Sequence, residues 1–191
     1  MTKLLIKLFI RNPDDIKDPS VRRKYGYLGS CTGITLNILL FLCKLAAGII
    51  SGSVSVTADA FNNLSDAGSS VMSLIGFRMA GKAADKEHPF GHGRMEYISG
   101  LVISFIIMMM GIELGKSSVS KIFSHEELNF SVLAFIILIV SVAVKSWMGY
   151  FYKKLGNIIS SASLSASAAD SFSDCAATGT VIIAMIVSLV T

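Results

Sequence analysis

The chain has 191 residues, of which 52% are hydrophobic and 16% charged, and its mean hydropathy is +0.64. Soluble domains carry about 25% charged residues, so this composition excludes an ordinary soluble fold and favours an integral membrane protein. The net charge of +4 comes from residues spread over several loops, and it does not indicate a nucleic-acid-binding face.

The first 27 residues precede the long apolar segments. The opening "MTKLLIKLFIRN" is interrupted by Lys3 and Lys7 and has no clear small-residue cleavage site, so we do not expect a cleaved signal peptide. This stretch could instead form a short amphipathic helix on the membrane surface. We interpret residues 1–27 as an N-terminal segment outside the membrane.

Five apolar segments follow, each close to the roughly 20 residues that a membrane-spanning helix needs. They cover residues 28–50, 55–80, 97–117, 130–151 and 163–190. Backbone polar groups inside lipid must be satisfied within the segment, so each should be a helix. The sequence therefore predicts an all-α integral membrane protein, a bundle of about five transmembrane helices in residues 28–191.

Basic residues flank these segments unevenly. They lie before the first segment and between the second and third, whereas the hairpin after the first segment has no charge: Lys17, Arg22, Arg23 and Lys24, then Lys82, Lys86 and Arg94. Because cytoplasmic loops are enriched in lysine and arginine, this pattern predicts a multi-pass cell-membrane protein with a cytoplasmic N-terminus.

Acidic and amide residues interrupt two of the apolar segments. Asn62 and Asp66 are four residues apart in 55–80, and Asp170 and Asp174 are four apart in 163–190, so each pair shares one helix face. A carboxylate at the centre of a spanning helix costs about 2.5–3.5 kcal/mol on insertion scales. Such residues should face the bundle interior, a water-filled cavity or a cation.

A divalent cation would relieve the repulsion between these gathered carboxylates. If the second and fifth segments pack together, Asn62, Asp66, Asp170 and Asp174 would form a compact set of oxygen ligands. The alternative is that these groups only hydrogen-bond the helices to one another. Asp59, on the same stripe, could admit ions to the site or pair with a nearby lysine.

Two lysines leave alternatives open, and the cysteines have one interpretation. Lys44 and Lys145 lie within apolar segments, where they could extend to the nearer interface or pair with an acid such as Asp59 or Glu113. The three cysteines form no CxxC pair and are interpreted as small buried residues without a disulfide.

The loop after the second segment, "ADKEHPFGHGRMEY", brings a carboxylate and two imidazoles close together. Asp85, His88 and His92 lie within eight residues, around a Pro-Gly turn. This set is a candidate divalent-metal site, although two such histidines are also common as simple loop residues.

These residues together resemble the cation diffusion facilitator (cation efflux) family over nearly the whole chain, from about Tyr25 to Thr191. The most specific matches are "ADAFNNLSD", "HPFGHGRME" and the Asp-x-x-x-Asp of the fifth segment, with support from "NILLFLCKLAAG". The resemblance implies a homodimeric, proton-coupled exporter of divalent metals with six helices and a cytoplasmic C-terminal domain. The sixth helix and that domain are not found in these 191 residues.

The resemblance also implies a transport site at Asn62, Asp66, Asp170 and Asp174, and in some members a loop site that matches Asp85, His88 and His92. Zinc-transporting members usually have histidine at one or both positions that are Asn62 and Asp170 here. An all-oxygen site suits Mn²⁺ better than the nitrogen- and sulfur-preferring Zn²⁺. The prediction is therefore a manganese-type exporter, with Fe²⁺ next and Zn²⁺, Co²⁺ or Cd²⁺ as further alternatives.

Two other function classes use the same residues. A passive cation channel would be lined by these acids, and a non-transporting metal sensor would bind metal without flux. An enzyme is not expected, because no nucleophile–base set or phosphate-binding glycine loop is present, and no cofactor is predicted. The expected partners are membrane lipid, divalent metal, protons and a second copy of the chain.

Overall fold

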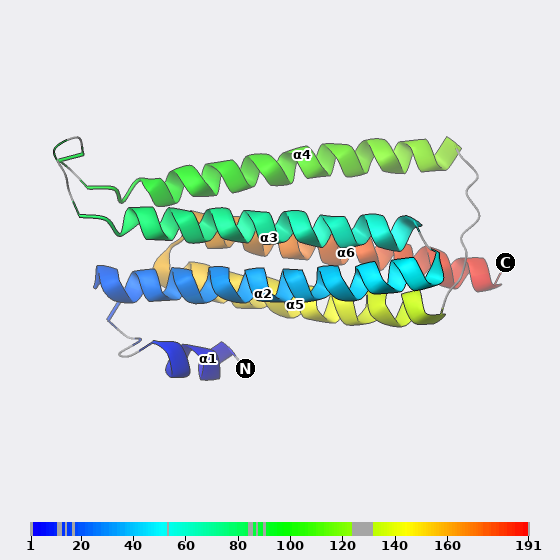
Figure 1. Ribbon diagram of the computed structural model, residues 1–191, viewed down its shortest axis with the longest axis horizontal. Coiled ribbons are helices and arrows are strands. Elements are labelled where there is room, and N and C mark those ends of the chain that lie inside the picture. Colours follow the sequence, from blue (N-terminus) through cyan, green and yellow to red (C-terminus); the bar gives the residue numbers. More distant parts are fainter. Residues whose placement is uncertain are drawn as a thin grey trace.

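The computed structural model describes residues 2–123 and 132–190, apart from positions 11, 12, 14, 17, 53, 84, 85, 87 and 90. All regular structure in this part of the chain is helical (Figure 1). The helices are α1 (Thr2–Phe9), α2 (Pro19–Ser51), α3 (Val54–Ala80), α4 (Met95–Phe123), α5 (Val132–Ile159) and α6 (Ala162–Val190). The predicted all-α bundle is thereby confirmed.

Helix α2 begins nine residues before the apolar segment that predicted it. The Asp18 side chain caps its first turn by accepting a hydrogen bond from the backbone N–H of Ser20 at 2.8 Å, and Pro19 occupies the first helical position. The same hydrogen bond holds the pKa of Asp18 below its usual value. The helix ends at Ser51 and is capped by Gly52, whose φ of 64° suits a residue without a Cβ.

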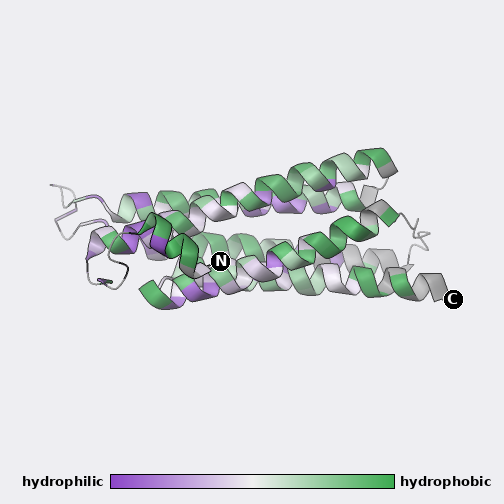
Figure 2. Cartoon of the chain, turned by 90° about the horizontal axis from the view of Figure 1, so that it is seen from below, coloured by the Kyte–Doolittle hydropathy of each residue, from purple (hydrophilic) through white to green (hydrophobic). Residues whose placement is uncertain are grey.

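Polar contacts join several helix ends at one end of the bundle. Arg22, near the start of α2, forms an ion pair of 2.9 Å with Glu96 of α4 and donates to the carbonyl of Ile159 at the end of α5. Arg23 donates to the carbonyl of Gly81, just after α3, at 3.1 Å. Because these contacts join helix starts to helix ends, consecutive long helices run antiparallel. Figure 2 shows that hydrophilic residues gather at this end of the bundle, near the α3–α4 loop.

Three helices of the described part are long and apolar enough to cross a membrane: the segments Pro19–Ile50, Met95–Glu113 and Phe135–Ile159. Large apolar side chains on these helices are exposed, including Leu101 at 71% and Phe105 at 58%, as expected of surfaces that face lipid. Helices α3 and α6, with 27 and 29 residues, are also long enough, but they contain the polar residues of the interior. That they span the membrane stays a prediction.

The hydrophobic core lies between α1, α2, α3, α5 and α6, toward the polar end of the bundle. Its buried members include Phe77, Phe151 and Leu155, and the N-terminal segment joins it through Ile6 of α1 and Ile10 just after α1. Further along α5 and α3, the core gives way to polar side chains that face one another inside the bundle. The core thus fixes the depth and rotation of the helices that hold these polar residues.

Candidate metal centre

Three carboxylates meet in the interior of the bundle. One oxygen each from Asp66 of α3 and from Asp170 and Asp174 of α6 lie within 4.8 Å of one another. Asp66 is 14 residues from the end of α3 and Asp174 is 12 residues from the start of α6, so both lie roughly 18–21 Å from the polar end at about 1.5 Å per residue. The cluster is therefore near the middle of the helices.

A lysine from a third helix contacts two of these acids. The Nζ atom of Lys145, on α5, donates to Asp66 Oδ2 and to Asp174 Oδ2, each at 2.6 Å. Only 3% of the Lys145 side chain is exposed. The alternative in which Lys145 extends to the membrane interface is thus wrong, because the paired carboxylates attract the ammonium into the bundle.

The remaining oxygen atoms of the two paired carboxylates differ in their partners. Asp174 Oδ1 accepts a hydrogen bond of 3.2 Å from the amide nitrogen of Asn62, which joins α3 to α6. Asp66 Oδ1 is buried and has no hydrogen-bond partner. A buried carboxylate oxygen without a partner is costly, so this atom is available to a ligand.

Asp59 belongs to a separate polar group, nearer the other end of α3. It forms an ion pair of 2.9 Å with Lys44 of α2, whose Nζ also donates to Asn63 Oδ1 at 3.0 Å. The Lys44 side chain is only 2% exposed. The alternative in which Lys44 extends to the membrane interface is therefore also wrong. Of the two alternatives given for Asp59 in the sequence, pairing with a nearby lysine is the one that the structure shows.

Residues 30–191 match the cation efflux transmembrane domain. The chain belongs to the cation efflux family. This confirms the resemblance found in the sequence.

Several curated proteins of known sequence are similar to this member of the cation efflux family. It is 34% identical over 151 residues to the manganese efflux system protein MneS of Bacillus subtilis (strain 168), and 36% identical over 151 residues to the uncharacterized transporter YdbO of the same strain. Each match covers 79% of this chain and 52% of the relative. Magnetosome protein MamB of Paramagnetospirillum magneticum is 29% identical over 156 residues, 82% of this chain and 53% of MamB. The chain thus spans about half the length of these relatives.

The candidate loop site lies in the segment between α3 and α4, outside the helices that hold the carboxylate cluster. The rings of His88 and His92 are tilted against each other with centroids 4.5 Å apart. Asp85, the third predicted ligand, lies outside the described residues. The loop site therefore stays a prediction.

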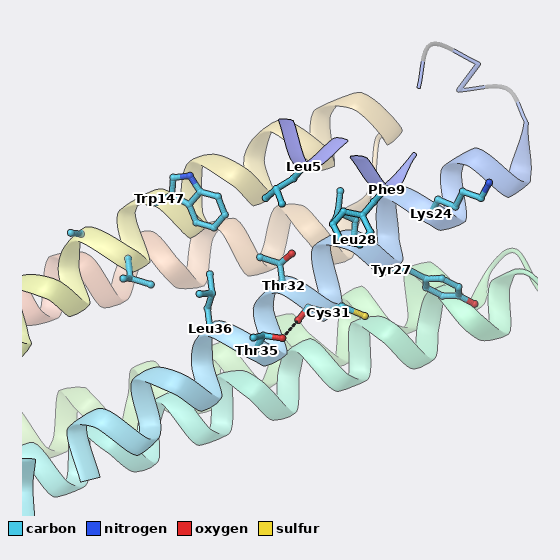
Figure 3. A pocket seen from close by; sticks show the side chains of 12 residues that line it. Leu5, Phe9, Lys24, Tyr27, Leu28, Cys31, Thr32, Thr35, Leu36 and Trp147 are labelled. Carbon is cyan, nitrogen blue, oxygen red and sulfur yellow. Dashed lines mark hydrogen bonds between the residues drawn. The ribbon is translucent and has the colours of Figure 1, made fainter. Parts of the chain in front are cut away.

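An apolar groove lies away from the acids, between α1, α2 and α5 (Figure 3). Its volume is about 850 Å³, and Phe9, Leu28, Leu36 and Trp147 are among its lining residues, with Lys24 as a basic one. Such a surface offers few ligands to a metal ion. Among the described residues, the acids close enough together to hold a metal ion are instead Asp66, Asp170 and Asp174.

Lys145 is the residue at the cluster that the sequence did not assign to the candidate site. The sequence signal was present, since a lysine within an apolar segment requires a partner or a route to the interface. Helix periodicity gives the face on which Lys145 lies along α5, but it does not say which neighbouring helix that face meets. The contact with α3 and α6 became known only from the packing.

Proposed function

We propose that this chain is the membrane transport domain of a divalent metal exporter that moves Mn²⁺ out of the cytoplasm in exchange for protons. Residues 28–191 form the domain, and residues 1–27 lie on the cytoplasmic side together with the polar end of the bundle. The metal is the transported substrate, and no enzymatic step is involved. The full-length protein acts as a homodimer in the cell membrane.

One observation supports this proposal above the others. Three carboxylate oxygens lie within 4.8 Å of one another in mid-bundle, and the buried Asp66 Oδ1 has no hydrogen-bond partner. Helix-to-helix hydrogen bonding alone does not require a buried, unpaired carboxylate oxygen in such a group. A bound cation would supply the missing partner and offset the repulsion between the carboxylates.

The ligand chemistry favours Mn²⁺. Asp66, Asp170 and Asp174 offer only oxygen, and Asn62 would add its amide oxygen after a rotation of the side-chain amide. Carboxylate, carbonyl and water suit Mn²⁺, whereas Zn²⁺ prefers nitrogen and sulfur ligands. The relative MneS is named as a manganese efflux protein, which points the same way. Fe²⁺ ranks second, followed by Zn²⁺, Co²⁺ and Cd²⁺.

Transport by alternating access follows from a single site between two helices. Metal from the cytoplasm binds the carboxylates while the polar end of the bundle is open, and rocking of the helices then exposes the site to the other side. There, protons compete with the metal for the same carboxylate oxygens and promote its release. Because one set of groups binds either ligand, metal and protons move in opposite directions.

Two rival functions use the same acids and make different predictions. A passive channel would conduct Mn²⁺ down its gradient whether or not a pH gradient is present. A metal sensor would bind Mn²⁺ but show no flux. The direct test is Mn²⁺ flux into proteoliposomes with the full-length protein, with and without a pH gradient.

We expect flux that depends on the pH gradient and is abolished by Asp66→Ala or Asp174→Ala. Thr35→Ala on α2 is a suitable control, because the Thr35 hydroxyl donates to the carbonyl of Cys31 within its own helix. Near-normal flux in both aspartate variants would refute the site, and gradient-independent flux would favour the channel.

A further inference from the structure

Lys145 is a buried cation in contact with the proposed metal ligands. It comes from α5, a helix that contributes none of the four proposed ligands. Its Nζ is 2.6 Å from one oxygen of Asp66 and 2.6 Å from one oxygen of Asp174, so it joins α3, α5 and α6 at a single atom. Charge-assisted hydrogen bonds of this length are strong. The ammonium thus uses oxygen atoms from the same carboxylates that a metal would need.

We propose that the Lys145 ammonium is a tethered counter-ion, which holds Asp66 and Asp174 together when the site is empty and moves away from them when a divalent cation binds. The idea rests on the proposed function, because it presupposes metal binding at these carboxylates. In this proposal α5 takes part in metal binding and release through Lys145, although it supplies none of the metal ligands.

Electrostatics requires the two cations to compete. A metal ion bound to Asp66 and Asp174 would lie within a few ångströms of the ammonium, where like charges repel strongly in a medium of low dielectric constant. The lysine side chain has a flexible four-carbon stem, so Nζ can move without a movement of α5 itself. Asn62 must also change, since its amide nitrogen now faces Asp174 and only its amide oxygen binds a metal.

The formal charges show what the lysine does for selectivity. When all three carboxylates are ionised, they and the ammonium together carry two negative charges, which a single divalent cation would bring to zero. A monovalent cation leaves one negative charge buried, which is unfavourable at this depth. Lys145 therefore favours a divalent ion, and it weakens metal binding enough to let the metal leave.

The test measures Mn²⁺ affinity by calorimetry on the detergent-solubilised full-length protein and its variants. Lys145→Met removes the charge but keeps an unbranched side chain of similar length, while Lys145→Arg keeps the charge. We expect Lys145→Met to lower the Kd for Mn²⁺ by at least about tenfold and to slow Mn²⁺ release, because the competing cation is gone. Lys145→Arg should leave the Kd within about threefold of the native value.

Lys44→Met is the matched control, because Lys44 is a buried lysine that pairs with Asp59 and Asn63 outside the cluster. It should leave the Kd for Mn²⁺ nearly unchanged. An unchanged or raised Kd in Lys145→Met would overturn the counter-ion role, provided that the native protein binds Mn²⁺. Failure of the native protein to bind or transport Mn²⁺ would instead refute the proposed function.

A second measurement uses the native sequence and does not depend on the folding of any variant. A structure of the full-length protein with Mn²⁺ bound should place Lys145 Nζ beyond hydrogen-bond distance of both Asp66 Oδ2 and Asp174 Oδ2. A structure with Mn²⁺ bound at the cluster and Nζ still about 2.6–2.9 Å from both oxygens would overturn the proposal.

Discussion

Asp59→Asn tests the buried ion pair between α2 and α3. In the native structure Lys44 is 2% exposed and contacts Asp59 at 2.9 Å and Asn63 at 3.0 Å. Removing one partner of a fully buried ion pair costs about 3–5 kcal/mol of folding free energy. Asp59 is 28% exposed and the Asn63 oxygen remains as an acceptor, so the loss should be closer to the about 1.5–3 kcal/mol of a hydrogen bond to a charged group.

The assay is equilibrium unfolding in mixed detergent micelles, followed by circular dichroism. A loss of this size raises the unfolding equilibrium constant roughly 10- to 150-fold. The double variant Lys44→Met with Asp59→Leu should be more stable than Asp59→Asn, because it leaves no unpaired buried charge. An Asp59→Asn protein with unchanged stability but greatly reduced Mn²⁺ flux would refute this reasoning, and would show that Asp59 instead admits ions to the site.

Two further predictions concern the metal ligands. Asn62→His combined with Asp170→His should shift the metal preference toward Zn²⁺ in a competition flux assay, because two imidazoles replace oxygen ligands; an unchanged metal ranking would place selectivity outside these positions. His88→Ala and His92→Ala should each retain substantial Mn²⁺ flux in proteoliposomes, since the loop is proposed to be secondary, and complete loss of flux would contradict that role.

Much of the architecture could be predicted because the bilayer imposes strong rules on sequence. Long apolar segments must be helices, and charged residues inside them must face the interior. The four-residue spacing of Asp170 and Asp174 sets their common face whatever surrounds them. The sequence therefore indicated both the helices and the residues that meet between them.

The start of α2 was not predicted, although the signal was in the sequence. Hydropathy marks the part of a helix that lies in lipid, and α2 continues about nine residues beyond the apolar segment. Asp18 followed by Pro19 is the pairing that often begins a helix, with a capping side chain and a residue whose φ is already helical. Capping chemistry locates this boundary better than hydropathy does.

The partners of the buried lysines could not be predicted for a different reason. A lysine in an apolar segment has two physical solutions, because its stem can extend to the interface or its ammonium can be neutralised inside. Lys44 and Lys145 take the second, and each meets acids on neighbouring helices. Which solution applies depends on how the helices are rotated against one another, and a single sequence does not give that rotation.

Anomalous diffraction at the manganese edge, from crystals of the full-length protein soaked in Mn²⁺, tests the proposed transport site most directly. We expect a peak between α3 and α6, within coordination distance of oxygen atoms of Asp66, Asp170 and Asp174. Mn²⁺ peaks elsewhere in the protein, with none between these three carboxylates, would contradict the account.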